Sequence, residues 1–338
     1  MARDPVTRLG RRHFLQGSLA LAGLGLLAGC GVVPAKRVPR IGYLGLAPVH
    51  FDDGFREGLR DLGYIEGENI SIEWRWAEGG RVERFPDVVD ELLSLDLDLL
   101  VTRTTVASLA ARRATSELPI VFSTVTSPLN AGLVTNLGRP EANVTGVSNS
   151  VQGIGGKRLQ LLKEVVPGAT RVAALGDFRN LTLNASGPLG LQEVQDAARN
   201  LGVDLLQHHA AGPDDFDGPF AAMNAEQAEA LLVVPSATVY LNARAHIVGL
   251  ANQARLPSMF EAREWTEAGG LLAYGVDLYN VNRQVATYVD KILKGARPAD
   301  LPVEQPTSFD FVINLKTANA LGITIPQSVL QQATEIIR

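Results

Sequence analysis

Short apolar runs alternate with amphipathic segments along the chain from residue 40 onward. Residues 40–46 form an apolar run that predicts a buried strand. The following segment spaces its apolar residues, from Phe51 to Leu62, at intervals of four, four and three, which is one face of a helix. Residues 69–76 alternate apolar and polar positions, which is typical of a strand. The chain therefore begins its folded part with a strand–helix–strand pattern.

The same alternation continues to the C-terminus with one interruption. It runs through helix 84–93, strand 98–102, helix 107–114, strand 119–123 and helix 130–137. After a polar stretch at 144–152 it restarts with helix 156–166, strand 171–175, helix 189–201, strand 203–207, helix 216–225, strand 230–234, helix 242–254 and strand 257–261. Strand 271–276, helix 281–294 and a last strand and helix follow. Such alternation predicts two α/β units in tandem, each a parallel sheet covered on both faces.

The length of the folded part also favours two lobes. About 300 residues exceed the usual size of a single hydrophobic core. We expect residues 40–147 with 273–305 to form an N-terminal lobe, and residues 148–272 with 306–338 to form a C-terminal lobe. In this arrangement the late elements recross a hinge between the lobes.

The first thirty residues predict export and attachment to a membrane. Arg11 and Arg12 precede an apolar run that ends in a short small-residue stretch before Cys30, the single cysteine of the chain. Paired arginines of this kind are typical of a Tat export signal, and small residues before one cysteine are typical of a lipoprotein cleavage site. We expect residues 1–29 to be a signal peptide, Cys30 to carry the lipid, and residues 30–39 to be a tether. The predicted location is therefore extracytoplasmic, on the membrane.

Composition excludes several classes of function. Removing residues 1–29 takes away four arginines and one aspartate, so the formal net charge moves from -5 to -8. An acidic body without a basic stripe argues against binding nucleic acid. The sequence has no G-x-S-x-G, P-loop or H-E-x-x-H motif, and one cysteine cannot form an internal disulfide. We expect no cofactor, no metal and no catalysis.

Candidate ligand residues follow the strands of the first unit. In parallel sheets, ligands bind outside the carboxyl ends of the strands. The candidates selected by this rule are Ala47, Phe51, Thr104, Thr105, Ser123, Thr124 and Ser127. Ser127 also fits as a helix cap, with Pro128 at the first helical position. A helix N-terminus at that place could bind an anion.

The second unit and the hinge supply charged and aromatic candidates. They are Asp177, Ser236, Tyr240, Glu261 and Asp277. Carboxylates suit an ammonium group, hydroxyls and backbone amides suit a carboxylate, and aromatic faces suit an apolar side chain, so an amino acid or related zwitterion fits the whole set. Two alternatives stay open. Asp277 could be the N-cap of the following helix, and Tyr240 could be ordinary packing.

Seven segments resemble a known family in combination. They are residues 55–64, 73–79, 119–122, 143–146, 157–164, 288–295 and 312–318. Together they resemble the TrpX-type family of ABC-transporter substrate-binding proteins, over residues 40–335. The family's Tyr-Gly-x-Asp/Asn turn matches Tyr274, Gly275 and Asp277. Its usual Asp-Pro-Val loop is here Ser127-Pro128-Leu129, and its Asn-Pro loop is replaced at residues 177–180.

This resemblance implies a type I periplasmic-binding fold with two Rossmann-like lobes, three hinge crossings and a ligand between the lobes. It also implies aromatic or other amino acids as ligands, and an ABC permease with its ATPase as partner of a monomeric receptor. A solute sensor for a signalling receptor would have the same sequence features. An exported enzyme lacks a supporting motif, and a sugar-responsive transcription regulator would need DNA-binding helices in place of the export signal.

Overall fold

The computed structural model describes residues 37–77, 81–140, 142–149, 151–178, 187–212, 215–234, 240 and 243–338. The chain divides into two compact units, Met1–Val38 and Pro39–Arg338, and every element below belongs to the second. The expected signal peptide, Cys30 and Ser236 lie outside the described residues. Among the helices of the described ranges, none combines the length and the apolarity that crossing a bilayer requires.

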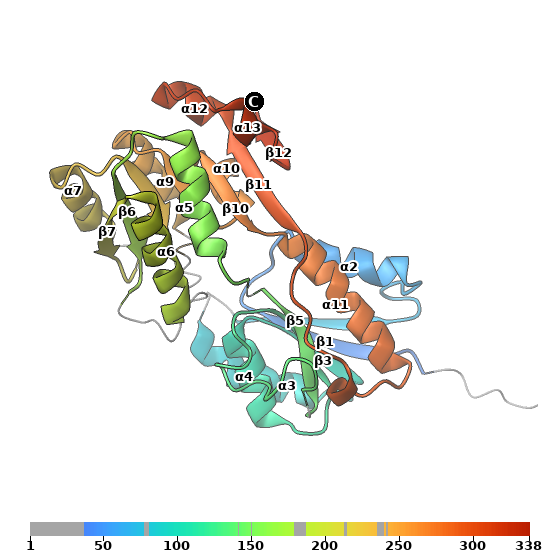
Figure 1. Cartoon of the computed structure of the whole chain (residues 1–338). Helices are drawn as coiled ribbons and strands as arrows, with labels where there is room; N and C mark the ends of the chain where they lie inside the picture. The colour runs from blue at the N-terminus through green and yellow to red at the C-terminus, as the bar shows by residue number, and fades with distance from the viewer. Residues whose placement is uncertain are drawn as a thin grey trace, which may run out of the picture. The chain divides into compact units, whose positions relative to one another are not determined.

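The first lobe is built on a parallel five-stranded sheet in the order β2-β1-β3-β4-β5. Its strands are β1 (Arg40–Gly45), β2 (Ser71–Trp76), β3 (Leu99–Arg103), β4 (Ile120–Val125) and β5 (Val144–Ser148). Helices α3 (Phe85–Leu93) and α4 (Thr105–Ala114) cover one face, and α2 (Asp52–Asp61) and α11 (Leu278–Leu293) cover the other. A short turn of 3-10 helix, η2 (Val82–Arg84), precedes α3. The helix α11 thus comes from the far end of the sequence and lies beside α2 (Figure 1).

The second lobe is built on a seven-stranded sheet in the order β12-β11-β10-β9-β8-β6-β7. Its strands are β6 (Arg171–Gly176), β7 (Asp204–His209), β8 (Ala230–Val233), β9 (Ser258–Phe260), β10 (Leu272–Val276), β11 (Phe309–Asn314) and β12 (Glu335–Ile337). The pairs are parallel except β10 with β11. Helices α5 (Ile154–Val165) and α6 (Gly187–Leu201) pack on one face, and α7 (Asp217–Ala225), α9 (Arg244–Gln253) and α10 (Arg263–Glu267) pack on the other. Helices α12 (Leu315–Leu321) and α13 (Gln327–Leu330) lie between β11 and β12 in sequence.

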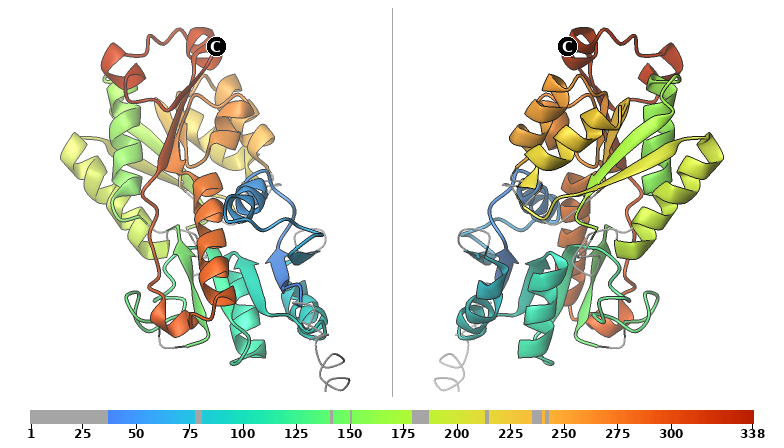
Figure 2. Two further views of the ribbon diagram at one scale, coloured as in Figure 1. Left: turned by 90° about the vertical axis from the view of Figure 1, so that its right-hand side faces the viewer. Right: turned by 90° about the vertical axis from the view of Figure 1, so that its left-hand side faces the viewer.

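The chain passes between the two sheets three times (Figure 2). It leaves the first sheet after β5, returns at the start of α11, and leaves again after the short 3-10 helix η4 (Pro298–Asp300). The first and last passages run together, because Ser148 N donates to Glu304 O at 2.9 Å and Val147 bridges Glu304 in parallel. These neighbouring segments connect the two lobes. The predicted fold class, with two lobes on parallel sheets, is confirmed.

Two local predictions are wrong for identifiable reasons. The helix expected at 130–137 is a series of turns, because Ser127 and Gly132 both adopt positive φ, at 50° and 71°, and break the helical path. The polar stretch around Thr145 is strand β5, because its polar groups are satisfied inside the lobe. Thr145 Oγ1 donates to Leu301 O at 2.8 Å, and a side chain at Gly146 would meet Phe122 O at 2.1 Å.

The strand β10 differs from the predicted lobe division. Residues 273–276 were expected in the N-terminal lobe, but they pair with β9 and β11 in the second sheet. The chain joins the first lobe only at α11, whose buried side chains, such as Val281 and Val285, pack against the first sheet. Apolar strand residues in this region carry no signal for which sheet they complete.

Candidate ligand-binding cleft

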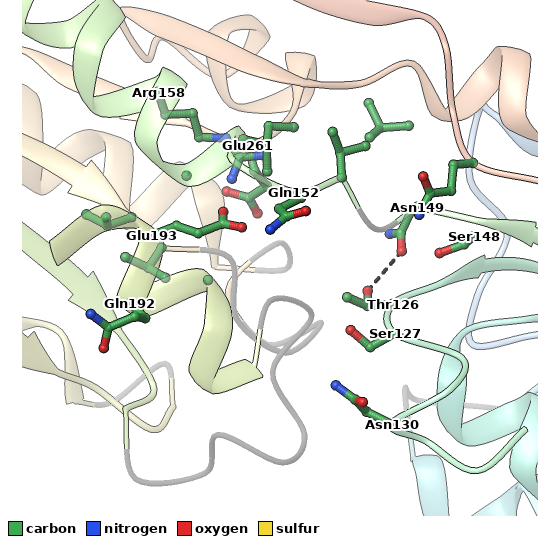
Figure 3. Close-up of a pocket in the computed structure, with 18 of the residues that line it drawn as sticks. Thr126, Ser127, Asn130, Ser148, Asn149, Gln152, Arg158, Gln192, Glu193 and Glu261 are labelled. Atoms are coloured by element: carbon green, nitrogen blue, oxygen red, sulfur yellow. Dashed lines mark hydrogen bonds between the residues drawn. The ribbon is translucent and has the colours of Figure 1, made fainter. Parts of the chain in front are cut away.

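A cavity of about 690 Å³ lies between residues of the two lobes (Figure 3). Its volume falls within the range of about 300–1,000 Å³ found for small-molecule sites. We call one side the first-lobe wall, whose polar members are Thr126, Ser127, Asn130, Ser148 and Asn149. We call the other side the second-lobe wall, whose charged members are Arg158, Glu193, Asp196 and Glu261. Aliphatic side chains, among them Leu129, Leu137 and Val194, complete the lining.

The first-lobe wall carries neutral hydrogen-bonding groups. Thr126 Oγ1 donates to Asn149 Oδ1 at 2.9 Å, which joins the loop after β4 to the end of β5 (Figure 3). The Ser148 hydroxyl makes an internal contact, because it donates to Val125 O at 2.9 Å. Ser127 and Asn130 lie further along the same loop and point toward the cavity (Figure 3). This wall can therefore donate to or accept from a ligand without supplying a formal charge.

Backbone strain gathers in the loops at the carboxyl ends of β3 and β4. Thr104, Thr124 and Ser127 all have positive φ, at 88°, 55° and 50°. Such values are uncommon for residues other than glycine, and they are rarest for β-branched residues such as threonine. Thr104 also has ψ of 153°, a region used almost solely by glycine, and its hydroxyl accepts from Ala107 N at 3.4 Å to cap α4. Strain of this kind persists where the surroundings impose it, often near functional sites.

A buried polar cluster holds the carboxyl end of the first sheet to α11. Ser123 Oγ donates to Asn282 Oδ1 at 2.9 Å, and both side chains are fully buried. The Tyr43 hydroxyl lies 2.7 Å from Asp52 Oδ1 and 3.2 Å from Asn282 Oδ1. Burial, followed by the charge of Asp52, raises the pKa of Tyr43 well above its usual value. Ser123, expected at the ligand, is thus committed to an internal contact.

Arg103 closes the gap between the ends of β1 and β3. Its Nε lies 3.4 Å from Asp52 Oδ1, with both side chains almost fully buried, and its Nη2 donates to Ala47 O. The guanidinium also lies 5.2 Å from the ring centre of Phe51. The loop that supplies the predicted residues Ala47 and Phe51 is therefore tied down by an arginine that sequence reasoning missed. A charged residue ending an otherwise apolar strand was the signal for it.

The second-lobe wall contains two opposite charges, the buried Arg158 and the half-buried Glu261. Arg158 on α5 is 5% exposed, and its Nε donates to Tyr274 O at 2.6 Å. Burial lowers the pKa of Arg158 to about 10, against the opposing effect of Glu261. Burial also raises the pKa of Glu261, and Arg158 opposes that shift. Helix pattern alone gave no reason to select Arg158, because a charged position on an amphipathic helix normally faces solvent.

Gly275 fixes how closely β10 approaches Glu261. A Cβ at this position would lie 1.7 Å from Glu261 O, so no other residue fits without moving the backbone. The preceding residue, Tyr274, accepts the Arg158 hydrogen bond at its carbonyl and stacks its ring on Phe309, with ring centres 5.9 Å apart. The Tyr-Gly pair therefore sets the second-lobe wall in place through its backbone.

The structure brings together part of the predicted site. Two of the predicted residues, Ser127 and Glu261, line the cleft. The predicted residues outside the lining are Ala47, Phe51, Thr104, Thr105, Ser123, Thr124, Asp177, Tyr240 and Asp277. Asn149, Arg158 and Glu193 line the cleft but were not selected from the sequence.

Three further outlying residues, besides those described above, also make contacts outside the cleft. Tyr240 is 1% exposed, donates its hydroxyl to Ala210 O at 2.6 Å, and packs edge-on against Phe216. Asp277 caps α11, because its Oδ1 accepts from Asn280 N at 3.0 Å. Asp177 lies 3.4 Å from Nδ1 of His209. The structure therefore contains the core packing that was one alternative for Tyr240 and the helix cap that was one alternative for Asp277.

The described part of the chain holds no group of three or more His, Cys, Asp or Glu side chains able to bind a metal ion. The cleft presents side-chain donors, acceptors and charges from two facing walls. Such an arrangement can hold a small polar solute by contacts from both lobes at once.

Comparison with known proteins assigns the class that this fold and cleft define. The family model described as ABC transporter substrate binding protein matches residues 47–337, so the chain belongs to that family. The family resemblance drawn from the sequence is thereby confirmed, and the two lobes have the type I periplasmic-binding fold.

Individual relatives agree with this assignment. The chain is 24% identical over 270 residues to a protein of Clostridioides difficile (strain R20291) named tyrosine-binding protein, covering 80% of this chain and 76% of the relative. It is similar to the structure of an ABC domain from Streptococcus pneumonia in complex with L-Trp, with 26% identity, a TM-score of 0.79, and coverage of 88% and 99% of the two chains. A conserved domain protein from Vibrio cholerae O1 biovar El Tor gives 28% identity, a TM-score of 0.78, and coverage of 89% and 100%.

Proposed function

We propose that this protein is the lipid-anchored, extracytoplasmic binding component of an ABC importer. It captures an amino acid between its lobes and passes it unaltered to a membrane permease. The observation that carries this proposal is the cleft, in which a neutral hydrogen-bonding wall faces a charged wall across about 690 Å³. Membership of the substrate-binding family supports the transport role.

The chemistry of the two walls supports a zwitterionic ligand. Hydroxyl, amide and backbone N–H groups near Ser127 and Asn130 suit a carboxylate, and the carboxylate of Glu261 suits an ammonium group. The aliphatic lining gives an apolar side chain a place to be buried. The names of two relatives, which refer to tyrosine and to bound L-Trp, favour an aromatic amino acid.

Capture requires contacts that form only when the lobes close. The three passages between the sheets can absorb a rotation while each lobe moves as a body. A ligand drives closure only as far as it binds the closed state more tightly than the open one. Side chains on both walls, such as Asn149 and Glu261, supply that difference.

The ligand is tested by thermal denaturation of the purified body with each amino acid in turn. A ligand present at 100 times its dissociation constant stabilises the folded state by about 2.7 kcal/mol. We expect tyrosine or tryptophan to raise the melting temperature, and mass spectrometry to recover the ligand unchanged. Absence of any shift with all amino acids, or turnover of the added compound, would contradict the proposal.

The anchor is tested separately. We expect Cys30→Ser to move the full-length protein from the membrane fraction to the soluble extracytoplasmic fraction, because no thiol remains to carry the lipid. Replacement of Arg11 and Arg12 by lysines should block export by the Tat route while leaving the cleft unchanged. A C30S protein that stays with the membrane would remove the lipid anchor from the proposal.

A further inference from the structure

His50 of the first lobe contacts Glu264 of the second lobe. The imidazole Nδ1 lies 3.5 Å from Glu264 Oε1, so the two side chains form an ion pair when the histidine is protonated. His50 lies in the loop between β1 and α2, and Glu264 lies in α10, so the contact joins the lobes away from the three passages of the chain. Neither residue lines the cleft. The contact can therefore influence the separation of the lobes without touching a ligand.

The loop that carries His50 is held in place by buried groups. Val49 N donates to Asp52 Oδ2 at 2.9 Å, and Arg103 donates to the backbone of the same loop. The imidazole also lies edge-on to Phe51, with ring centres 5.4 Å apart. A loop that is already fixed loses little conformational freedom when one of its side chains contacts another lobe. The position of His50 therefore follows the position of the first lobe as a body.

On the first lobe, the charged side chains around His50 pair with one another. They are Asp52, Asp53, Arg56 and Arg103. Asp53 Oδ1 lies 3.1 Å from Arg56 Nη1, and Asp52 Oδ1 lies 3.4 Å from Arg103 Nε. Because these charges compensate each other within the lobe, they do not replace the contact between His50 and Glu264.

On the second lobe, Glu264 lies among like charges. Burial is the main cause of the raised pKa of Glu261, and the charge of Glu264 adds to it. Burial, followed by the charge of Asp277, raises the pKa of Asp310, and Glu264 adds to this shift as well. Arg263 opposes the shift at Asp310, but its ion pairs are with other acidic side chains. A positive charge close to Glu264 therefore relieves repulsion at this edge of the second lobe.

We propose that His50 and Glu264 form a proton-dependent latch, which holds the two lobes together when the imidazole is charged and releases them when it is neutral. Histidine side chains change their charge between about pH 5 and about pH 8. Protonation of His50 adds the charge that Glu264 attracts, so a fall in pH favours the arrangement with the contact. Because His50 is half exposed, we expect the ratio of latched to unlatched molecules to change by about threefold. This inference goes beyond the proposed function and needs no ligand, so its failure would leave that proposal standing.

The test measures the distance between the lobes in the full-length protein without ligand. Cys30→Ser removes the natural thiol, and Arg60→Cys on α2 and Ala268→Cys at the end of α10 place one spin label on each lobe, at exposed positions. Pulsed electron paramagnetic resonance then gives the populations of short and long label separations. We expect the short separation to gain about threefold over the long one when the pH falls from about 8 to about 5.5.

Variants at both ends of the contact identify the latch. We expect the pH response to disappear in His50→Gln and in Glu264→Gln, with no further change when the two are combined, because both remove the same contact. His50→Lys should favour the short separation at both pH values, since lysine stays charged. His246→Gln is the matched control. His246 lies 3.6 Å from Asp217 within the second lobe and is about as exposed as His50, so this variant should respond to pH as the wild type does.

The contrary outcomes are equally specific. Label separations that do not respond to pH in the wild-type sequence would overturn the inference. A response that persists in H50Q, or effects of H50Q and E264Q that add, would also overturn it. A response that is lost in H50Q and kept in E264Q would show that His50 acts through another partner, and would remove the latch.

Discussion

The two walls of the cleft obtain their function by different physical means. The first-lobe wall has neutral hydroxyls and amides on loops whose backbone is strained, as at Ser127. The second-lobe wall has formal charges on or beside regular secondary structure, as at the buried Arg158 on α5 and the half-buried Glu261 after β9. A strained backbone can hold a side chain in a fixed position without adding any charge. A charge that is removed from water is costly unless an opposite charge or a hydrogen bond compensates it. The first wall therefore offers neutral hydrogen-bonding groups, and the second wall offers formal charges.

We expect the largest effect on folding stability from a substitution that displaces the backbone of the second-lobe wall. Gly275→Ala places a Cβ about where Glu261 O already lies, so β10 must move away from Glu261. We expect a loss of about 3 kcal/mol of folding stability, measured by chemical denaturation. Gly168→Ala is the matched control, because nothing lies within 4 Å of its Cβ position. Wild-type stability in G275A would mean that the close approach is not needed.

The charge on the second-lobe wall should make stability depend on pH. Because burial raises the pKa of Glu261, the folded protein holds this proton to a higher pH than the unfolded chain does. The contribution of Glu261 is therefore most favourable below the unfolded-state pKa and is lost as the pH rises through the folded-state pKa. Arg158 and Glu264 face the same carboxyl and are unchanged in the E261Q variant. We expect E261Q to exceed the wild type by about 2 kcal/mol at high pH and by less at low pH. A gap that does not vary with pH would contradict this.

Relief of the backbone strain at Thr104, in the first lobe, should raise the folding stability. Thr104→Gly places glycine in a backbone region that suits it, at φ 88° and ψ 153°. We expect a gain of about 1 kcal/mol in folding stability, since the strain released exceeds the loss of a long capping bond. Thr104→Ala, which keeps the strain and loses the cap, should be less stable than the wild type. If both variants lose stability in denaturation curves, the hydroxyl matters more than the strain.

The smallest effect is expected at Asp277, which lies outside both walls. Asp277→Ala removes the side chain that caps α11 and should cost about 1 kcal/mol of stability. Because Asp277 does not line the cleft, ligand affinity should change less than twofold in calorimetry. Asp277→Asn should restore the cap. Weakened binding with full stability would instead support the sequence-based expectation that Asp277 contacts the ligand.

The sequence predicted the fold far better than the cleft. The alternation of strand and helix patterns predicted the order of the elements. The prediction was wrong where the local signal was ambiguous, as in the polar strand around Thr145. The rule of carboxyl strand ends selected Ser127 and Glu261, which line the cleft. It could not find Arg158, because the orientation of one side chain on a helix depends on how that helix packs. It also could not separate Ser123, which turns inward to Asn282, from its neighbours in the same loop.

The cleft between the lobes has a consequence for the lifetime of the protein. A ligand that binds only the folded protein makes the filled molecule open less often than the vacant one. Proteases that act on opened chains attack in proportion to how often opening occurs. Under the proposed function, a molecule with bound solute is therefore cleaved more slowly than one without it.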